Sequence, residues 1–537
     1  MEENITPVET EQPKKKKDRL KINVVLNVIY QFLVIIVPFV TAPYISRVLQ
    51  PEGVGIYEYT YSLATFFTMF ASFGTLTYGT MAIAQRRESK KEYTQTFWEI
   101  ETLAVFLAVT ATSAWLVFST FYTDYKIFMY LLGFHVIAAC FDISWLYAGL
   151  EKFKYTIGVN ALSKIATMVL IFIFVKTRDD LWIYVLINSV GLLAGNLTMW
   201  LFLFRVVGRY KIKFANMKGH FKETFVFFIP TIATTIYTVL DKALIGLLIQ
   251  GTNESGEKLA DIENGYYGQA MKIITAAKAV SFIAINNVMC SRASFLYKKQ
   301  NNYKLGTLLK NTYNLTLTLS IGACFGIVGV APIFAPLYFG PGYDKSILLL
   351  QILAAILPII CVSNVLGSIY YTPSGRRKQS SIYLVIGSAV NLVLNIPFII
   401  FFKSVGAAIA SILAELVITI LYVWKSNKRT TIKELFHYTW KKLVAGGAML
   451  GAIYGFRFLL TKYIDDISLF VALFSIGLFI YIVLLIILKD DIFILMRIYA
   501  NKVIRKIKHQ DVGEDPIPLE EAGVEGNQNE STAGNEM

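Results

Sequence analysis

Positively charged side chains interrupt the long apolar stretches of this chain. Six lysines and arginines lie inside stretches long enough to cross a bilayer: Lys164, Lys242, Lys272, Lys278, Arg292 and Arg457. A cation at the centre of a bilayer costs on the order of 3 kcal/mol, so such residues usually face water, protein or a ligand. The first hypothesis is therefore a cationic pathway for an anionic ligand.

Acidic residues in the same stretches are candidates for ion coupling or for pairing with the lysines: Glu58, Asp142, Asp241 and Glu415. Lys242 follows Asp241 directly, so on a helix the two side chains point about 100° apart. We expect Asp241 to pair with Lys272 or Lys278 of the next stretch, or to contact the ligand or a coupling ion itself.

Three arginines have simpler interpretations. Arg292 and Arg457 lie near the ends of their stretches, where a long side chain can reach the membrane interface. Arg47 opens a PEGVG turn on the side of the membrane where basic residues are rare. It is a candidate gate or anion contact, and a helix-end contact at the interface is the alternative.

The composition indicates that the membrane is the solvent for most of the chain. Of 537 residues, 55% are hydrophobic and only 16% are charged, which is too apolar for a soluble protein of this size. The basic run from Lys14 to Lys17 precedes the first apolar stretch, and no small-residue cleavage site follows it. We therefore expect this stretch to be retained as the first span.

Apolar stretches of about 20 residues predict fourteen membrane spans. They cover residues 22–45, 53–75, 97–119, 126–149, 156–175, 181–204, 223–249, 266–296, 311–334, 346–371, 380–402, 405–424, 443–460 and 467–488. The predicted inner segments hold 37 lysines and arginines and the outer segments 8. This asymmetry places both termini in the cytoplasm. It also explains the net charge of +14 by topology and attraction to anionic membrane lipid, without nucleic acid.

An internal repeat divides the spans. Pro38 lies in the first span and is followed by PEGVG (51–55), whereas Pro230 lies in the seventh and is followed by DIENGYYG (261–268). Six spans per copy give a parallel repeat about an axis along the membrane normal, with a central cavity between two six-helix bundles. Pro38 and Pro230 are gating candidates, with ordinary helix kinks as the alternative.

The predicted organisation is an all-α integral membrane protein with an N-lobe, a C-lobe and two extra C-terminal spans. Its segments are a basic cytoplasmic N-terminus (1–21), the N-lobe (22–204), a linker (205–222), the C-lobe (223–424), a second linker (425–442), the last two spans (443–488), an amphipathic interfacial helix (489–509) and a disordered acidic tail (510–537).

The residues for other chemistry are missing. The cysteines Cys140, Cys290, Cys324 and Cys361 are far apart, and His135 is alone among the spans, so no metal site is expected. No GxxxxGK[ST], GxSxG or HExxH motif occurs, and the predicted outer loops are short. We expect no cofactor and no enzyme activity, which disfavours a membrane glycosyltransferase or polymerase.

Several motifs carry a family resemblance. They are RVLQPEGVGIYEYTYSLATFFTMFASFGTLTYG (47–79), VLDKALIGLL (239–248), NGYYGQAMKI (264–273), SNVLGSIYYTPSGRRKQ (363–379) and GSAVNLVLNIPFI (387–399). In this order they resemble the polysaccharide-transporter branch of the multidrug/oligosaccharidyl-lipid/polysaccharide exporter superfamily, and most closely the Wzx-type flippases. The resemblance runs from about Lys21 to Trp424.

The resemblance implies a flippase in the cytoplasmic membrane. It would translocate an undecaprenyl-pyrophosphate-linked oligosaccharide by alternating access, for surface polysaccharide biosynthesis and export. Candidate pyrophosphate contacts are Lys164, Lys242, Lys272, Lys278 and Arg47, since cations can replace the hydration of a phosphate. A polysaccharide polymerase and a chain-length regulator are candidate partners. A lipid II flippase and a cation-coupled multidrug antiporter of the same fold are the alternatives.

Overall fold

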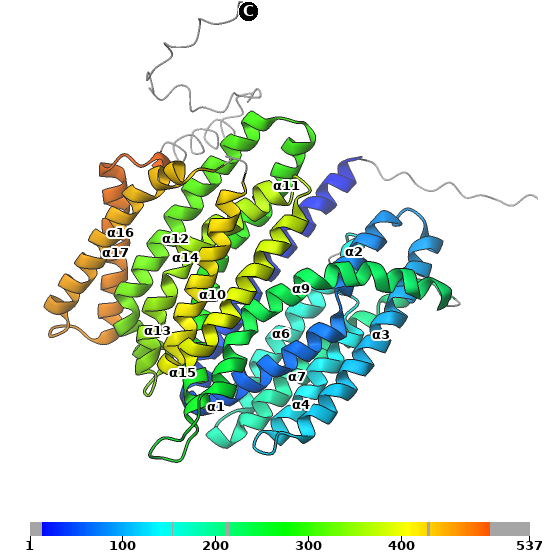
Figure 1. Cartoon of the computed structure of the whole chain (residues 1–537), viewed down its shortest axis with the longest axis horizontal. Coiled ribbons are helices and arrows are strands. Elements are labelled where there is room, and N and C mark those ends of the chain that lie inside the picture. Colours follow the sequence, from blue (N-terminus) through cyan, green and yellow to red (C-terminus); the bar gives the residue numbers. More distant parts are fainter. Residues whose placement is uncertain (1–12, 153, 211–213, 427–429, 494–537) are drawn as a thin grey trace, which may run out of the picture.

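The computed structural model describes residues 13–152, 154–210, 214–426 and 430–493, and its regular structure is helical (Figure 1). The helices are α1 (Pro13–Ser72), α2 (Thr75–Gln85), α3 (Lys90–Thr120), α4 (Lys126–Ile137), η1 (Ala138–Phe141), α5 (Ser144–Gly149), α6 (Lys154–Phe174), η2 (Arg178–Asp180), α7 (Leu181–Trp200), α8 (Leu203–Val206), α9 (Phe214–Leu248), α10 (Leu259–Lys278), η3 (Ala279–Ile283), α11 (Ala284–Lys298), α12 (Asn302–Phe339), α13 (Asp344–Ala354), α14 (Ile356–Leu366), η4 (Gly367–Tyr371), α15 (Arg377–Trp424), α16 (Ile432–Leu460) and α17 (Asp466–Ile487).

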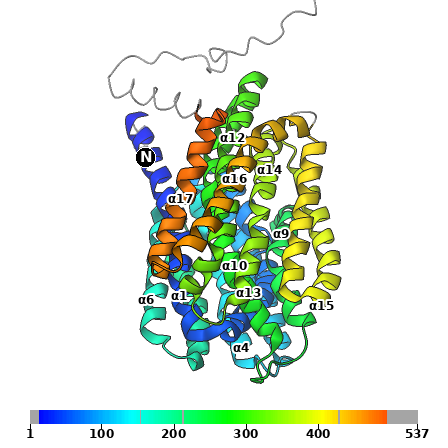
Figure 2. The same ribbon diagram turned by 90° about the vertical axis from the view of Figure 1, so that its left-hand side faces the viewer.

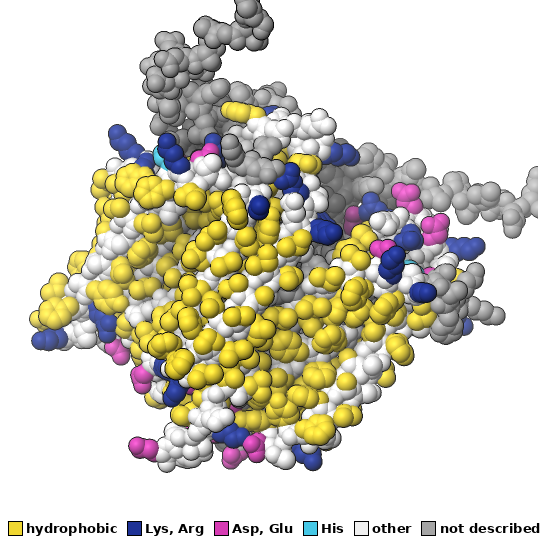
Figure 3. All heavy atoms as spheres, in the orientation of Figure 1, with side chains coloured by type: hydrophobic (Ala, Val, Ile, Leu, Met, Phe, Trp, Pro, Cys, Tyr) yellow, Lys and Arg dark blue, Asp and Glu magenta, His cyan; other side chains and the backbone are white. Residues whose placement is uncertain are grey.

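The surface has the pattern of a membrane protein. On the face in Figure 3, apolar side chains cover the middle, and charged side chains gather toward the two opposite edges. Large apolar residues such as Phe106, Phe401 and Phe479 are more than half exposed, which suits contact with lipid. Within the described residues, ten helical segments are long and apolar enough to cross a membrane. The all-α membrane fold is therefore confirmed.

The number of spans stays a prediction. Predicted spans eleven and twelve both lie in α15, in which only Lys403 (φ 55°) departs from helical backbone geometry. Spans one and two are likewise joined in α1, broken at Gln50 (φ 60°, ψ 173°). Gln50 precedes Pro51, and a residue before proline is disfavoured in the helical region. Pro51 itself suits the first turn of the helix that follows.

Two helices begin inside the predicted linkers. Helix α9 begins at Phe214, inside linker 205–222, and α16 begins at Ile432, inside linker 425–442. Thr431 and Glu434 form a capping box that starts α16. Residues 1–12 and 494–537, which include most of the predicted interfacial helix and the whole acidic tail, lie outside the described residues.

A buried lysine joins the C-terminal helices to each other and to the main bundle. Lys442, predicted to lie in a linker, is a buried residue of α16. Its ammonium donates to Asp490 at 2.9 Å and to Asn314 of α12 at 2.7 Å. Figure 2 shows α16 and α17 beside α12, and an apolar cluster that includes Val330 and Met449 joins them.

The two copies of the predicted repeat contact each other just after their equivalent turns, through α1 and α10. A Cβ atom on Gly55 of α1 would lie 1.6 Å from the backbone oxygen of Asp261, and one on Gly265 of α10 would lie 2.0 Å from that of Pro51. The contact is reciprocal, because the same offset along the chain relates both pairs of residues. Glycine is required at both positions, since any side chain would push the two backbones apart.

Candidate functional site

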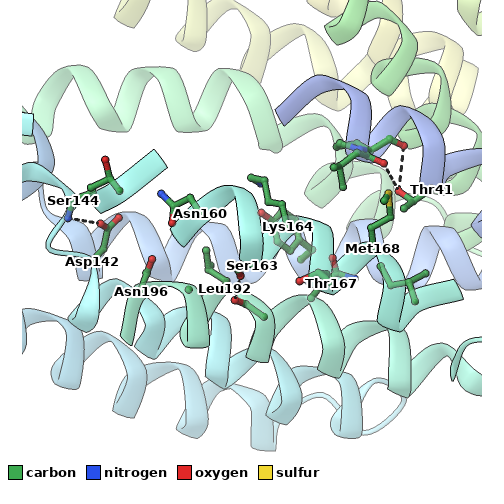
Figure 4. Close-up of a pocket in the computed structure, with 18 of the residues that line it drawn as sticks. Thr41, Asp142, Ser144, Asn160, Ser163, Lys164, Thr167, Met168, Leu192 and Asn196 are labelled. Carbon is green, nitrogen blue, oxygen red and sulfur yellow. Dashed lines mark hydrogen bonds between the residues drawn. The ribbon is translucent and has the colours of Figure 1, made fainter. Parts of the chain in front are cut away.

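A cavity of about 750 Å³ lies between α1, α6 and α7. Among its polar lining residues are Thr41, Tyr57, Glu58, Tyr61, Asp142, Ser144, Asn160, Ser163, Lys164, Thr167, Tyr184, Asn188, Asn196 and Lys272. Figure 4 shows Asn160, Ser163, Lys164, Thr167 and Met168 along α6, with Asp142 and Ser144 toward one end of the cavity and Thr41 toward the other.

Helix α6 places its polar residues by periodicity. Asn160 and Lys164 are four residues apart and therefore share one face of the helix, and both line the cavity. Leu162, Val169 and Ile173 are exposed apolar residues of the same helix. The apolar residues suit lipid, and the polar face is turned to the cavity.

Lys164 is a candidate cation without a hydrogen-bond or salt-bridge partner among the described residues. Within the described residues its ammonium has no hydrogen bond and no salt bridge, although its side chain is only partly exposed and lines the cavity. A half-buried ammonium without a counter-ion can bind an anion without first breaking another contact.

Glu58, in contrast, holds two of the predicted lysines. Its carboxylate accepts from the Lys242 ammonium at 2.6 Å and lies 3.0 Å from that of Lys272. Glu58 is 3% exposed and comes from α1, whereas the lysines come from α9 and α10. The cluster therefore joins the first copy of the repeat to the second.

A second cavity, of about 500 Å³, adjoins the first. Pro38 and Lys272 line both cavities, so the predicted gating proline lies where they meet. Asp241, Lys242 and Lys278 line the second cavity but not the first.

The expected salt bridge of Asp241 with Lys272 or Lys278 is not formed among the described residues. The buried Asp241 carboxylate accepts hydrogen bonds from Asn395 at 2.7 Å, from Ser411 at 2.6 Å and from the Tyr267 hydroxyl. Because α9 turns Asp241 toward α15, its near neighbours are neutral donors. No residue that the structure describes forms a salt bridge with it, and Lys272 pairs with Glu58 instead.

Lys278 and Glu415 lie in the same region as Asp241. Lys278 is close enough to Glu415 and Asp241 to interact electrostatically with both, and it ends α10 directly before the π-helical turn η3. Ser363 donates to the Glu415 carboxylate at 2.9 Å. Single π-helical turns inside longer helices are frequent at functional sites.

The structure separates the remaining candidates from the cavities. The Arg47 guanidinium donates to the carbonyl of Leu337 at 2.5 Å, in the last turn of α12, where a cation suits the unpaired carbonyls. Neither cavity includes Arg47, Arg292 or Arg457 among its lining residues. Pro230 lies in α9, outside the residues whose side chains are described.

Sequence reasoning missed several buried acids, and Glu101 is one of them. Glu101 of α3 is 2% exposed, and its Oε1 atom has no hydrogen-bond partner among the described residues. Asp142 is near enough to interact with it electrostatically. Its place inside the predicted span 97–119 was the available signal, because a carboxylate in an apolar stretch is costly. The polar residues of α6 and α7 were also missed, since neutral amides and hydroxyls barely interrupt an apolar stretch.

Comparisons with known proteins agree on the kind of molecule. The chain is 27% identical over 428 residues to a protein named putative O-antigen transporter from Escherichia coli (strain K12), an alignment that covers 76% of this chain and 98% of that protein. It is 23% identical over 249 residues to the probable low-salt glycan biosynthesis flippase Agl15 of Haloferax volcanii, covering 46% of this chain and 50% of that protein.

A solved structure shows the same fold. The lipid II flippase MurJ, in a conformation described as inward closed, superimposes with a TM-score of 0.67 at 16% identity, covering 88% of this chain and 99% of that one. The sequence profile of the family described as polysaccharide biosynthesis protein matches residues 20–290. Since the profile spans half of the chain, this protein belongs to that family, in the polysaccharide-transporter branch of the exporter superfamily that its motifs indicate.

Proposed function

We propose that this protein is a flippase for a lipid-linked oligosaccharide and moves it from the inner to the outer leaflet of the cytoplasmic membrane. The proposal rests on one observation above all: an unpaired lysine, Lys164, lies in a cavity whose lining combines neutral amides and hydroxyls with apolar side chains. The cation suits a pyrophosphate, and the amides and hydroxyls suit the sugars. The relatives named transporter and flippase support this class of function over an enzyme.

Two finer parts of the proposal follow from the resemblance: the carrier is undecaprenyl pyrophosphate, and the mechanism is alternating access between lobes 22–204 and 223–424. The distribution of basic residues supports cytoplasmic termini. Lys242, Lys272 and Lys278 are further pyrophosphate candidates, and a polysaccharide polymerase and a chain-length regulator are proposed partners. Arg47 is the weakest candidate, because a helix-end carbonyl already occupies its guanidinium.

Ion coupling is proposed at the buried acids. Glu58 is neutralised by two lysines, whereas Asp241 has only neutral hydrogen-bond donors in contact. A buried carboxylate without a cation in contact favours binding of a proton or a metal cation. Asp241 is therefore the first coupling candidate, with Asp142 and Glu415 as the others.

Transport into sealed vesicles tests the function. Purified protein in proteoliposomes should transfer a fluorescent undecaprenyl-pyrophosphate oligosaccharide to the leaflet that an added glycosidase can reach. Protein-free liposomes provide the background rate. A rate equal to that background, for this substrate and for lipid II, would contradict the proposal. Transport of lipid II alone would favour the alternative flippase.

A further inference from the structure

The Glu58 carboxylate already contacts the two lysines that the pyrophosphate of the substrate would need. Lys242 and Lys272 both point their ammonium groups at one carboxylate, at 2.6 Å and 3.0 Å. Glu58 and Lys272 line the cavity that contains Lys164. A pyrophosphate offers more negative charge and more acceptor oxygens than a carboxylate does, so it can compete for the same two lysines.

The same cluster joins the two copies of the repeat. Glu58 lies on α1 three residues after Gly55, which makes the reciprocal backbone contact with α10. A Cβ on Gly268 would lie 2.7 Å from Cγ of Glu58. The missing side chain at position 268 therefore lets the carboxylate reach across to Lys242 and Lys272.

Other ion pairs at this end of the molecule are more exposed. Arg178 pairs with Glu52 and Glu257, and Lys258 pairs with Asp124, with cation side chains 44% and 42% exposed. Exposed pairs of this kind contribute little. Removing one member of a buried pair costs far more, because the other charge is left uncompensated. Lys242 and Lys272 therefore require an anion, and Glu58 supplies it when the cavity is empty.

We propose that Glu58 is an internal counter-ion which the pyrophosphate of the substrate displaces, and that this exchange releases the contact between α1 and α10 at the predicted outer end. The inference rests on the proposed function. Its physical basis is reciprocity. If closing the outer end requires the Glu58 carboxylate to contact the lysines, closure lowers their affinity for another anion. Binding of that anion must then destabilise the closed state by the same coupling free energy.

Release of the contact between α1 and α10 should make the cavity more accessible from outside, and this accessibility can be measured. The full chain, with its native cysteines replaced, carries a reporter cysteine at Asn160, which lines the first cavity. An impermeant thiol reagent is applied to the outside of intact cells. In Glu58→Gln, the reporter should react at least about fivefold faster than in the otherwise identical protein, the lower end of typical coupling between sites.

Glu263→Gln is the matched control. Glu263 is also a buried acid, but its partner at 2.5 Å is Lys345, and both belong to the second copy of the repeat. Its neutralisation should leave labelling of the reporter near the level of the parent protein. Equal labelling in Glu58→Gln and Glu263→Gln would overturn the inference.

A ligand experiment avoids any substitution in the cluster. In proteoliposomes with a known orientation of the reporter protein, undecaprenyl pyrophosphate should speed labelling from the predicted outer side at least about fivefold, and undecaprenol, which has no phosphate, should not. If undecaprenyl pyrophosphate binds in a separate fluorescence titration but labelling stays unchanged, the displacement inference fails and the proposed function stands. If the pyrophosphate lipid does not bind and the undecaprenyl-pyrophosphate oligosaccharide is not transported, the proposed function fails.

Discussion

The second half of α1 and helix α10 are equivalent parts of the predicted repeat, yet they contribute opposite charges to one ion cluster. They share the turn and the glycines, Gly55 and Gly265, through which their backbones touch. The first copy contributes an acid, Glu58, and the second contributes Lys272 together with Lys242 of the preceding helix. The shared features therefore serve packing, and the features that differ create an ion cluster across the contact.

Lys164 and Lys272 give a second comparison within one cavity. Both were predicted from the same signal, a cation inside an apolar stretch, and both line the cavity. Lys272 is held by Glu58, whereas Lys164 has no partner among the described residues. A free cation is ready for an anionic ligand, and a paired one must first exchange its partner.

The largest effect should come from breaking what the two copies share. Gly55→Ala places a Cβ against the backbone oxygen of Asp261 and should destabilise the protein by about 3 kcal/mol, the upper end for overpacking. Thermal unfolding of the detergent-solubilised protein measures it. Gly158→Ala is the control, because nothing lies within 4 Å of its added Cβ. Equal stability of the two variants would contradict the close contact.

Removing the unpaired cation should reduce transport without affecting folding. Lys164→Gln loses a charged contact worth about 1.5–3 kcal/mol, so transport should fall about tenfold or more. Lys164→Arg should retain more activity, because it keeps the charge. Membrane abundance of all variants should stay unchanged, and full transport in Lys164→Gln would remove Lys164 from the site.

The ion cluster should reveal itself as coupling between substitutions. Lys272→Gln and Glu58→Gln should each lower stability, and the double variant should lose less than their sum by about 1 kcal/mol, within the usual range for contacting charges. The pair Lys272→Gln and Asp241→Asn should be additive, because Asp241 contacts neutral donors. Denaturation of the three single variants and the two doubles measures this. Coupling of Lys272 to Asp241 instead would restore the original pairing hypothesis.

The smallest effect is expected at Arg47. Its side chain is exposed and donates to a carbonyl in the last turn of α12, a contact worth about 0.3–1 kcal/mol. Arg47→Gln should therefore change transport less than about threefold. A loss as large as that of Lys164→Gln would show that Arg47 contacts the substrate after all.

The fold class and most helix positions could be predicted from the sequence, because apolar length and the distribution of basic residues reflect the bilayer itself. The sequence predicted turns near Gln50 and Lys403. It did not show that each turn is a single non-helical residue between two helices, because that depends on the local backbone geometry. The helix starts at Phe214 and Ile432 were missed, because the prediction followed apolar stretches and the polar starts of these two helices lie outside them.

The sequence by itself determined that this chain is a polytopic helical membrane protein, and it predicted an internal repeat and cations within the spans. Only the tertiary structure decided which of those cations are free. Spacing along a helix shows which side chains share its face, but the partner on a neighbouring helix depends on how the helices cross. Here the glycine contact between α1 and α10 brings Glu58 to Lys242 and Lys272, whereas the Asp241 carboxylate accepts hydrogen bonds from Asn395 and Ser411 of α15.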